Sequence, residues 1–485
     1  MSTDQVADRP AVVPVDERPA RDGAPRSTAL LEGLALVLAG LLAIGTAVQV
    51  AVTGDLRPAL LVGAGLAAVL LVVLGLVRFA LFVPAVLALR TAVDAAHPAA
   101  DSGLAQQSSA LPASLLALLF VGTAVVWLAA QHRAHGRLVW SPVSTAAVAL
   151  VGAGAVSTIG SAQPLVSAAE LARVLTALLM FVVVEQLVTT RDRRRVLLAV
   201  FISALAPLVL VAQQALTSTG IVVDGLSRVR GTFVHPNGLG FYLVLLLVTG
   251  TAVARHLPWR PRLALLTLVA ACSAALVASY SRGAWLALGV GLLVVGTLQS
   301  KRLIAGVVGA VALVLVLVPS AQARLTDLEA GRTERGTAGN SFVWRVDYWS
   351  QSLELVQDDP VSGIGLKVTQ SVTDEAKAPH NDFLRVYVEA GVLGLIAYLG
   401  LLAALVHRAR SALRAARAGP GGLDRGLAVG FAGCLGAFLV FSIGGNLISQ
   451  VVVLWSFHAL AAIARPGPGV PSPPVPAPAP VPVRT

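Results

Sequence analysis

Long apolar runs separated by short polar breaks make up most of this chain. A helix that crosses a bilayer needs about 20 mostly apolar residues. By that criterion the pattern predicts about fourteen spans, at roughly 28–52, 58–76, 79–95, 111–130, 143–159, 168–188, 196–214, 237–254, 263–280, 284–299, 303–318, 386–406, 426–443 and 448–464. Only Arg78 separates the second from the third, so twelve or thirteen spans also fit. The expected fold is therefore all-α, a polytopic transmembrane helical bundle of about 12–14 spans.

One polar break is long and covers residues 319–385. Apolar residues recur within it at helical spacing: Phe342, Val346, Trp349, Leu353 and Val356. This spacing predicts a short amphipathic helix over 341–357, which Asp358-Asp359-Pro360 should end. Its apolar stripe fits two placements, either over the ends of the spans or along the membrane surface.

Lys and Arg gather in alternate breaks, and this decides the expected orientation. The basic breaks are 133–137, 191–195, 255–262, 301–302 and 408–425, whereas 96–110, 160–167 and 444–447 contain no Lys or Arg. The positive-inside rule places the basic breaks in the cytoplasm, and an even span count places both termini there as well. The long break 319–385 is then extracytoplasmic.

The expected organisation follows from this topology. It comprises a disordered N-terminal tail (1–26), a first membrane region (27–318), the extracytoplasmic loop (319–385), a second membrane region (386–464) and a Pro-rich disordered tail (465–485). Both tails are expected in the cytoplasm of a multi-pass cell-membrane protein.

Composition excludes a soluble protein. Hydrophobic residues make up 56% of the 485 positions and charged residues 13%, with a mean hydropathy of +0.80, whereas soluble domains carry about 25% charged residues. The net charge of +11 belongs to the topological arginines, and no aromatic-interleaved basic patch indicates a nucleic-acid partner. Cys272 and Cys434 lie inside apolar runs and predict neither a disulfide nor a metal site.

Three expected outer-face segments carry polar residues that a lipid-embedded bundle has no structural need for: Arg228–Gly238, Ser279–Trp285 and Ala378–Phe383. Arg282 lies between two apolar runs, where a guanidinium is costly unless it faces a cavity or a partner, or reaches the lipid head groups. Arg230 precedes a Pro-Asn pair that opens a helix. Two arginines near helix N-termini form a site suited to phosphate or diphosphate.

His380 is the candidate acid or base of the third segment, because histidine takes up a proton near neutral pH. Asp382 or Glu389 could orient its ring, and a structural or solvated histidine is the alternative. The chain has no HExxH, GxSxG or Walker sequence, which argues against a membrane protease, an esterase and an ATP-driven pump. Glu170 and Glu185 are the few carboxylates that could serve proton-coupled transport.

Four stretches, taken in order, resemble the O-antigen ligase and polymerase family of membrane glycosyltransferases. They are Arg230–Asn237, Ser281–Trp285, Trp344-Arg345 with Trp349 and Asp359–Gly365, and Pro379–Leu384 followed by Glu389–Gly394. The similarity covers roughly residues 225–400. Each stretch alone is a weak signal, and their order around a long loop makes the set specific.

The resemblance implies transfer of a glycan from an undecaprenyl-diphosphate carrier to a glycan or lipid acceptor hydroxyl on the outer face of the membrane, in cell-envelope polysaccharide synthesis. It implies no metal and no other cofactor. Arg230 and Arg282 would bind the diphosphate, and His380 would activate the acceptor hydroxyl. The supporting residues would be Arg345, Asn381, Asp382, Asn237 and His235, the last standing where the family more often has a non-titrating residue.

Two other classes of function also fit an apolar polytopic chain. One is a solute transporter, for which paired intramembrane carboxylates would argue. The other is a non-catalytic scaffold of an envelope-glycan assembly, with the Pro-rich tail as its docking segment. Ligase and polymerase activity share the donor site and differ only in the acceptor, which no motif encodes.

Overall fold

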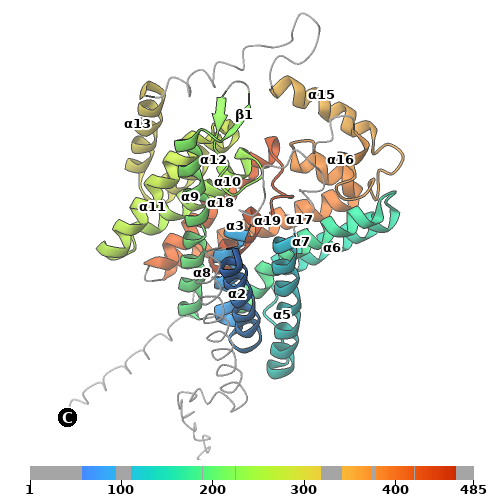
Figure 1. Ribbon diagram of the computed structural model, residues 1–485, viewed down its shortest axis with the longest axis horizontal. Coiled ribbons are helices and arrows are strands. Elements are labelled where there is room, and N and C mark those ends of the chain that lie inside the picture. The colour runs from blue at the N-terminus through green and yellow to red at the C-terminus, as the bar shows by residue number, and fades with distance from the viewer. Residues whose placement is uncertain are drawn as a thin grey trace, which may run out of the picture. The chain divides into compact units, whose positions relative to one another are not determined.

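The computed structural model describes residues 57–93, 111–187, 189–223, 226–317, 341–373, 378–419 and 421–465 of the chain. The chain divides into two compact units, Met1–Val73 and Leu74–Thr485. Most of helix α2 (Arg57–Val77) belongs to the first unit, and every other element belongs to the second (Figure 1). The expected N-terminal tail, the expected span 28–52 and nearly all of the Pro-rich tail lie outside the described residues.

Helices account for almost all of the secondary structure in the described ranges. They are α3 (Phe79–Val93), α5 (Leu111–His135), α6 (Pro142–Gly160), α7 (Pro164–Gln186), α8 (Thr190–Ile202), α9 (Leu205–Thr217), α10 (Pro236–Ala254), α11 (Trp259–Ala278), α12 (Arg282–Gln299), α13 (Lys301–Leu317), α15 (Ser341–Glu354), α16 (Thr369–Val372), α17 (Asp382–Ala418), α18 (Leu423–Gly444) and α19 (Val451–Ile463). Strands β1 (Ile221–Val223) and β2 (Leu226–Arg228) form one small antiparallel hairpin. The predicted all-α fold is confirmed.

Many of these helices are long and apolar enough to cross a membrane. Within the described ranges nine candidates meet that description: α5, α6, α7, α8 with α9, α10, α11, α12, α17 and α18. Three shorter apolar helices, Gly65–Val77, Phe79–Val93 and Val451–Ile463, accompany them. Arg78 does separate two helices, since α2 ends at Val77 and α3 begins at Phe79. These helices confirm the polytopic bundle.

Helix α10 lies in the core of the second unit. Seventeen of its nineteen residues are buried, and it packs against α11, α12 and α18. Glycines permit this close packing: a Cβ at Gly240 would lie 2.8 Å from Ala284, and one at Gly291 would lie 2.6 Å from Val248. Small residues let membrane helices approach closely where larger side chains would hold them apart.

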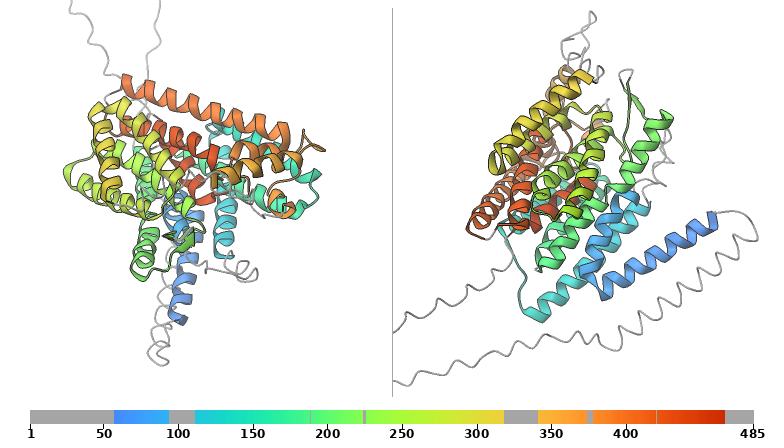
Figure 2. Two further views of the ribbon diagram at one scale, coloured as in Figure 1. Left: turned by 90° about the horizontal axis from the view of Figure 1, so that it is seen from above. Right: turned by 90° about the vertical axis from the view of Figure 1, so that its left-hand side faces the viewer.

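Helix α17, the long orange helix in the left view of Figure 2, is broken at Gly391. There the backbone turns to φ 64° and ψ −165°, a conformation that glycine adopts without strain. The segment 360–365 restores the hydrogen bonds lost at the break. The N–H groups of Ile364 and Gly365 donate to the carbonyls of Val388 and Glu389, at 3.1 Å each.

The pairing also runs in the other direction. The N–H groups of Val392 and Leu393 donate to the carbonyls of Pro360 and Val361, at 2.9 and 3.2 Å. A Cβ at Gly391 would lie 2.1 Å from the carbonyl oxygen of Val361. The stretches Asp359–Gly365 and Glu389–Gly394, which the sequence analysis noted separately, therefore form one structural unit.

The predicted amphipathic helix is present as α15 and ends at Glu354, before Asp358-Asp359-Pro360. Its packed face differs from the predicted stripe. Val346 and Leu353 are 45% and 44% exposed, whereas Tyr348 and Ser352 are buried. Tyr348 is held by a 2.7 Å hydrogen bond between its hydroxyl and that of Thr373. Of the predicted stripe, Val356 is buried and Trp349 is half-buried, so the packed face keeps part of the stripe and adds Tyr348 and Ser352.

Candidate functional site

Two helix N-termini meet where the sequence predicted an anion site. Helix α10 begins at Pro236, and His235 caps it by accepting a 3.1 Å hydrogen bond at Nδ1 from the N–H of Asn237. Helix α12 begins at Arg282, and the hydroxyl of Ser281 donates to Oδ1 of Asn237 at 3.0 Å. The first two predicted segments are thus brought together, with Asn237 joining them. Helix N-termini favour anions because their first N–H groups have no intrahelical partner.

Arg228 is a third arginine at this junction, and the sequence analysis did not select it. Its side chain is buried, Nε donates to the carbonyl of Ser279 at 2.9 Å, and Nη2 donates to Oδ1 of Asn237 at 3.1 Å. The reasoning that selected Arg230, an arginine on an apolar outer face, applied equally to its neighbour. Arg228 ties the start of α10 to the end of α11.

Arg230 lies in the turn before α10, and its contacts are local. Its backbone N–H and that of Gly231 both donate to Oε1 of Gln214, at 2.9 and 3.0 Å. Its Nη1 donates to the carbonyl of Val234 at 3.4 Å. Gln214 on α9 was not predicted and fixes this turn through its side-chain amide.

Helix α15 lies against the segment that carries His380. The Trp344 and His380 rings meet edge to face with centroids 5.8 Å apart. Nε1 of Trp349 donates to the carbonyl of Pro379 at 2.7 Å. The aromatic residues of α15 therefore hold the backbone and the ring of the candidate base.

Arg345 follows Trp344 and lies near the arginines of the helix junction. Burial lowers the pKa of Arg345, and the charge of Arg282 lowers it further. Among the described residues no carboxylate forms an ion pair with Arg345, and its Nη1 would lie 3.3 Å from a Cβ at Gly444. Two guanidinium groups close enough to repel each other favour an anion between them.

The same positive field acts on His235. Burial of the ring by surrounding protein atoms, with the charges of Arg228 and Arg345, lowers the pKa of His235 to about 4. The residue nevertheless keeps an exposed surface. These observations agree if protein atoms crowd the ring while one face stays open to solvent. His235 is then neutral at physiological pH and a weak base, because a pKa near 4 gives little driving force for taking a proton.

The predicted supporting residues of the third segment have structural roles at the start of α17. Oδ1 of Asn381 caps the helix by accepting from the N–H groups of Phe383 and Leu384, at 3.0 and 3.1 Å. The buried carboxylate of Asp382 accepts from the N–H groups of Leu447 and Ile448, at 3.1 and 3.2 Å. His380 itself has φ 54°, a left-handed conformation that costs energy in a non-glycine residue.

The connection between α18 and α19 links the start of α17 with the start of α10. Leu447 and Ile448 bind Asp382, as described, and a Cβ at Gly238 would lie 2.8 Å from Oε1 of Gln450. Nη1 of Arg345 lies near Gly444, the last residue of α18 before this connection. The third predicted segment is therefore joined to the first two through this connection and through α15.

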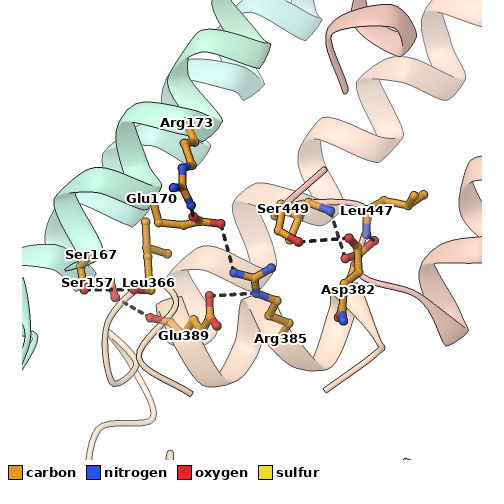
Figure 3. A network of polar contacts seen from close by, with 12 residues as sticks. Ser157, Ser167, Glu170, Arg173, Leu366, Asp382, Arg385, Glu389, Leu447 and Ser449 are labelled. Carbon is orange, nitrogen blue, oxygen red and sulfur yellow. Dashed lines mark hydrogen bonds and ion pairs between the residues drawn. The ribbon is translucent and has the colours of Figure 1, made fainter. Parts of the chain in front are cut away.

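Glu389 does not fill its predicted place beside His380, because Arg385 binds it. Nε of Arg385 lies 3.1 Å from Oε2 of Glu389, and Nη2 lies 3.2 Å from Oε1 of Glu170 on α7 (Figure 3). Arg173 pairs with the other oxygen of Glu170 at 3.1 Å. Both glutamates were predicted as candidates from the sequence, whereas Arg385, which directly precedes an expected span, was not.

Metal ligands are not clustered in the described part of the chain, where no group of three or more His, Cys, Asp or Glu side chains could hold an ion. Cys272 and Cys434 are both buried and free. The metal-free reaction expected from the sequence remains a prediction.

Comparison with known proteins supports the motif analysis. Residues 263–399 match the model of a family described as O-antigen ligase. No curated protein matches the chain. The matched stretch includes Arg282, Arg345 and His380. It begins after Arg230 and His235, which lie outside it. The resemblance inferred from the motifs is confirmed.

Proposed function

We propose that this chain, which matches the O-antigen ligase family model over residues 263–399, transfers a glycan from an undecaprenyl-diphosphate carrier to an acceptor hydroxyl. The family places it in the assembly of envelope glycans at a membrane. The observation that carries the proposal is the proximity of Arg345 to Arg282, since the two charges influence each other and α12 begins at Arg282. Two guanidinium groups beside a helix N-terminus are chemically suited to binding a diphosphate.

The chemistry divides between the arginines and the histidine. The bond between the anomeric carbon and the diphosphate oxygen breaks as the acceptor oxygen bonds to that carbon. The electron pair leaves with the diphosphate, whose growing charge Arg282, Arg345 and Arg230 stabilise. The acceptor proton passes to His380, because arginine stays protonated and cannot accept it. Trp344 and Trp349 hold His380 in place.

A reconstituted reaction tests this function. The protein in lipid nanodiscs is mixed with a lipid-diphosphate glycan and an acceptor glycan or lipid, and transfer and donor binding are both measured. We expect transfer to persist in EDTA, because the arginines carry the charge that a metal would otherwise neutralise. Loss of transfer in EDTA that a divalent ion restores would overturn the metal-free mechanism. Donor uptake into vesicles without transfer would instead support a transporter.

The transporter alternative receives no support from the two intramembrane carboxylates. Glu170 pairs with Arg385 and Arg173, and Glu185 pairs with Arg408. Ion pairs with arginines are a structural use of these carboxylates and differ from the carboxylate pairs across repeats that would favour a transporter.

The proposed site requires residues 319–385 to lie outside the cell and the termini inside it. A cysteine replacing exposed Ser371 should react with an impermeant maleimide added to intact cells, and one replacing exposed Ala418 should not. The native cysteines are buried and supply little background. The reverse labelling pattern would rule out both the orientation and an outer-face reaction.

A further inference from the structure

A buried charge cluster lies one turn beyond the start of α17, outside the proposed catalytic groups. Its central residues, Arg385, Glu389 and Glu170, are 1%, 3% and 3% exposed. Arg385 bridges the two carboxylates at 3.1 and 3.2 Å (Figure 3). The guanidinium thus joins the first turns of α17 to α7.

The piece of α17 that carries this cluster is short. Because the helix breaks at Gly391, residues 382–390 are not held in line by the rest of α17. They depend on tertiary contacts, of which Arg385 to Glu170 is one and Asp382 to the N–H groups of Leu447 and Ile448 is another. A nine-residue helix is only marginally stable by itself.

The cluster is poorly suited to stabilising the fold. Nη1 of Arg385 and Oε1 of Glu389 are buried without a hydrogen-bond partner among the described residues. A buried ion pair stabilises only when its remaining polar atoms are satisfied, and well-packed apolar residues are often as stable or more so. The geometry of the ion pairs specifies where the short helix 382–390 lies. Apolar residues in their place would not specify this position.

Hydrogen bonds hold the backbone on both sides of His380. On one side, Nε1 of Trp349 holds the carbonyl of Pro379 at 2.7 Å. On the other side, Asn381 caps α17, and its carbonyl accepts from the N–H of Arg385 at 2.9 Å. The left-handed backbone of His380 at φ 54° is maintained only while the hydrogen bonds on both sides are present.

We propose that Arg385, through Glu170 and Glu389, is a positioning residue that sets the location of His380 relative to the diphosphate site. The proposal rests on the function proposed above, in which His380 is the base. Arg385 acts through the first turn of α17 and does not contact substrate. Misplacing a base by about 1 Å can reduce the rate of a reaction by about 100-fold.

The test replaces the charge cluster by apolar residues of similar size, in the variant Glu170→Leu/Arg385→Met/Glu389→Leu. We expect its thermal midpoint to equal or exceed that of the wild type. We expect kcat for transfer to fall about 10- to 100-fold, while KM for the donor lipid stays unchanged because Arg282 and Arg345 remain. A structural role alone would lower the thermal midpoint together with activity. Wild-type kcat in the folded triple variant would overturn the proposal.

A matched control comes from the other end of the same two helices. Glu185 on α7 and Arg408 on α17 form a 2.7 Å ion pair. The variant Glu185→Leu/Arg408→Met removes a comparable pair far along both helices, so kcat per folded molecule should stay at the wild-type value. An equal fall of kcat in both variants would refute a specific effect on His380.

Two further variants keep the test decisive. If the triple variant does not reach the membrane, Glu170→Gln keeps the shape of the side chain and removes its charge. It should lower kcat per folded molecule without changing donor KM, while the thermal midpoint falls because Arg385 loses one of its two buried anions. Wild-type kcat per folded molecule there would refute the proposal. His380→Ala separates the two hypotheses. If it transfers glycan normally, the proposed function is wrong, whereas if it is inactive and the triple variant is active, only the positioning role is wrong.

Discussion

Two arginine–glutamate pairs join α7 and α17, one near the start of both helices and one at the end of α7, and the two pairs are used differently. At the C-terminal end of α7, Glu185 accepts from Arg408 at 2.7 Å and from Ser144 at 3.0 Å. Arg408 also donates to the carbonyls of Ala461 and Ala462, at 2.7 Å each. These carbonyls belong to the last turn of α19, which has no intrahelical partners for them. The charged groups of Glu185 and Arg408 are thus paired, and we call these residues and their partners the Glu185 cluster.

Arg193 also binds the end of α19 and adds to the Glu185 cluster. Nε and Nη2 of Arg193 donate to the carbonyl of Ile463, at 3.1 and 2.9 Å, and Nη2 pairs with Asp424 at 2.9 Å. At the end that contains the family motifs, by contrast, Nη1 of Arg385 and Oε1 of Glu389 have no hydrogen-bond partner among the described residues. Burial and the charge of Arg282 lower the pKa of Arg345, and His380 has a left-handed backbone. The difference fits our proposal that one end serves stability and the other serves a ligand and its chemistry.

The largest effect should follow from removing His380, the proposed base. His380→Ala should lower transfer by about 10²- to 10⁴-fold, the usual contribution of a general base. Donor-lipid binding should stay near normal, because the arginines are intact. Transfer in nanodiscs and binding of the labelled donor lipid measure the two quantities.

His235→Ala is the matched control for that variant, since it removes a histidine from the same site. It should cost the α10 cap, about 0.5–2 kcal/mol of stability, and leave most of the transfer activity. An inactive His235→Ala beside an active His380→Ala would mean that the base has been misassigned.

The next effect concerns the geometry of the diphosphate contact. Arg282→Lys should lower transfer by about 10- to 100-fold although the charge is kept, because lysine cannot make two parallel hydrogen bonds to a phosphate. Arg410→Lys, on the exposed basic face of α17, should change nothing. Normal transfer by Arg282→Lys at a normal membrane level would favour an arginine that reaches the lipid head groups.

A variant of the Glu185 cluster should change stability and leave catalysis intact. Arg408→Met leaves Glu185 buried without its cation, and breaking a buried pair in this way costs about 3–5 kcal/mol. The thermal midpoint should fall clearly, while transfer per folded molecule stays at the wild-type value. A fall in kcat without a change in thermal midpoint would remove the distinction between the two ends.

The smallest effect is expected for the charge of His235. Its pKa lies at about 4, below the ordinary value, so it loses no proton between pH 5.5 and 8. The stability it contributes is present above the unfolded pKa near 6.5 and is lost as pH falls towards 4, since the unfolded chain binds the proton more tightly. The pH profile of transfer for His235→Gln should superimpose on that of the wild type over this range. A displaced acidic limb would show that His235 titrates during the reaction.

Much of the architecture follows from local sequence. An apolar run of about 20 residues must form a helix in lipid, because the backbone has no other hydrogen-bond partners there. The start of α10 at Pro236 was likewise predicted, since proline favours the first position of a helix. Helix α17 begins at Asp382, four residues before the expected span 386–406. The candidates His380 and Arg282 were also visible, because polar residues beside apolar runs need a reason.

The partners of these residues could not be read from the sequence. Arg385 and Glu170 are 215 positions apart, and whether they meet depends on how α7 and α17 pack and rotate. The sequence assigned Glu389 or Asp382 to His380, whereas packing gave the first to Arg385 and the second to the N–H groups of Leu447 and Ile448. Helix formation is decided within a few residues along the chain, so the sequence alone determined the spans and the site's candidate residues. Charge pairing is decided between helices, where desolvation penalises every unmatched group, so only the tertiary structure determined which of these charges pair with one another.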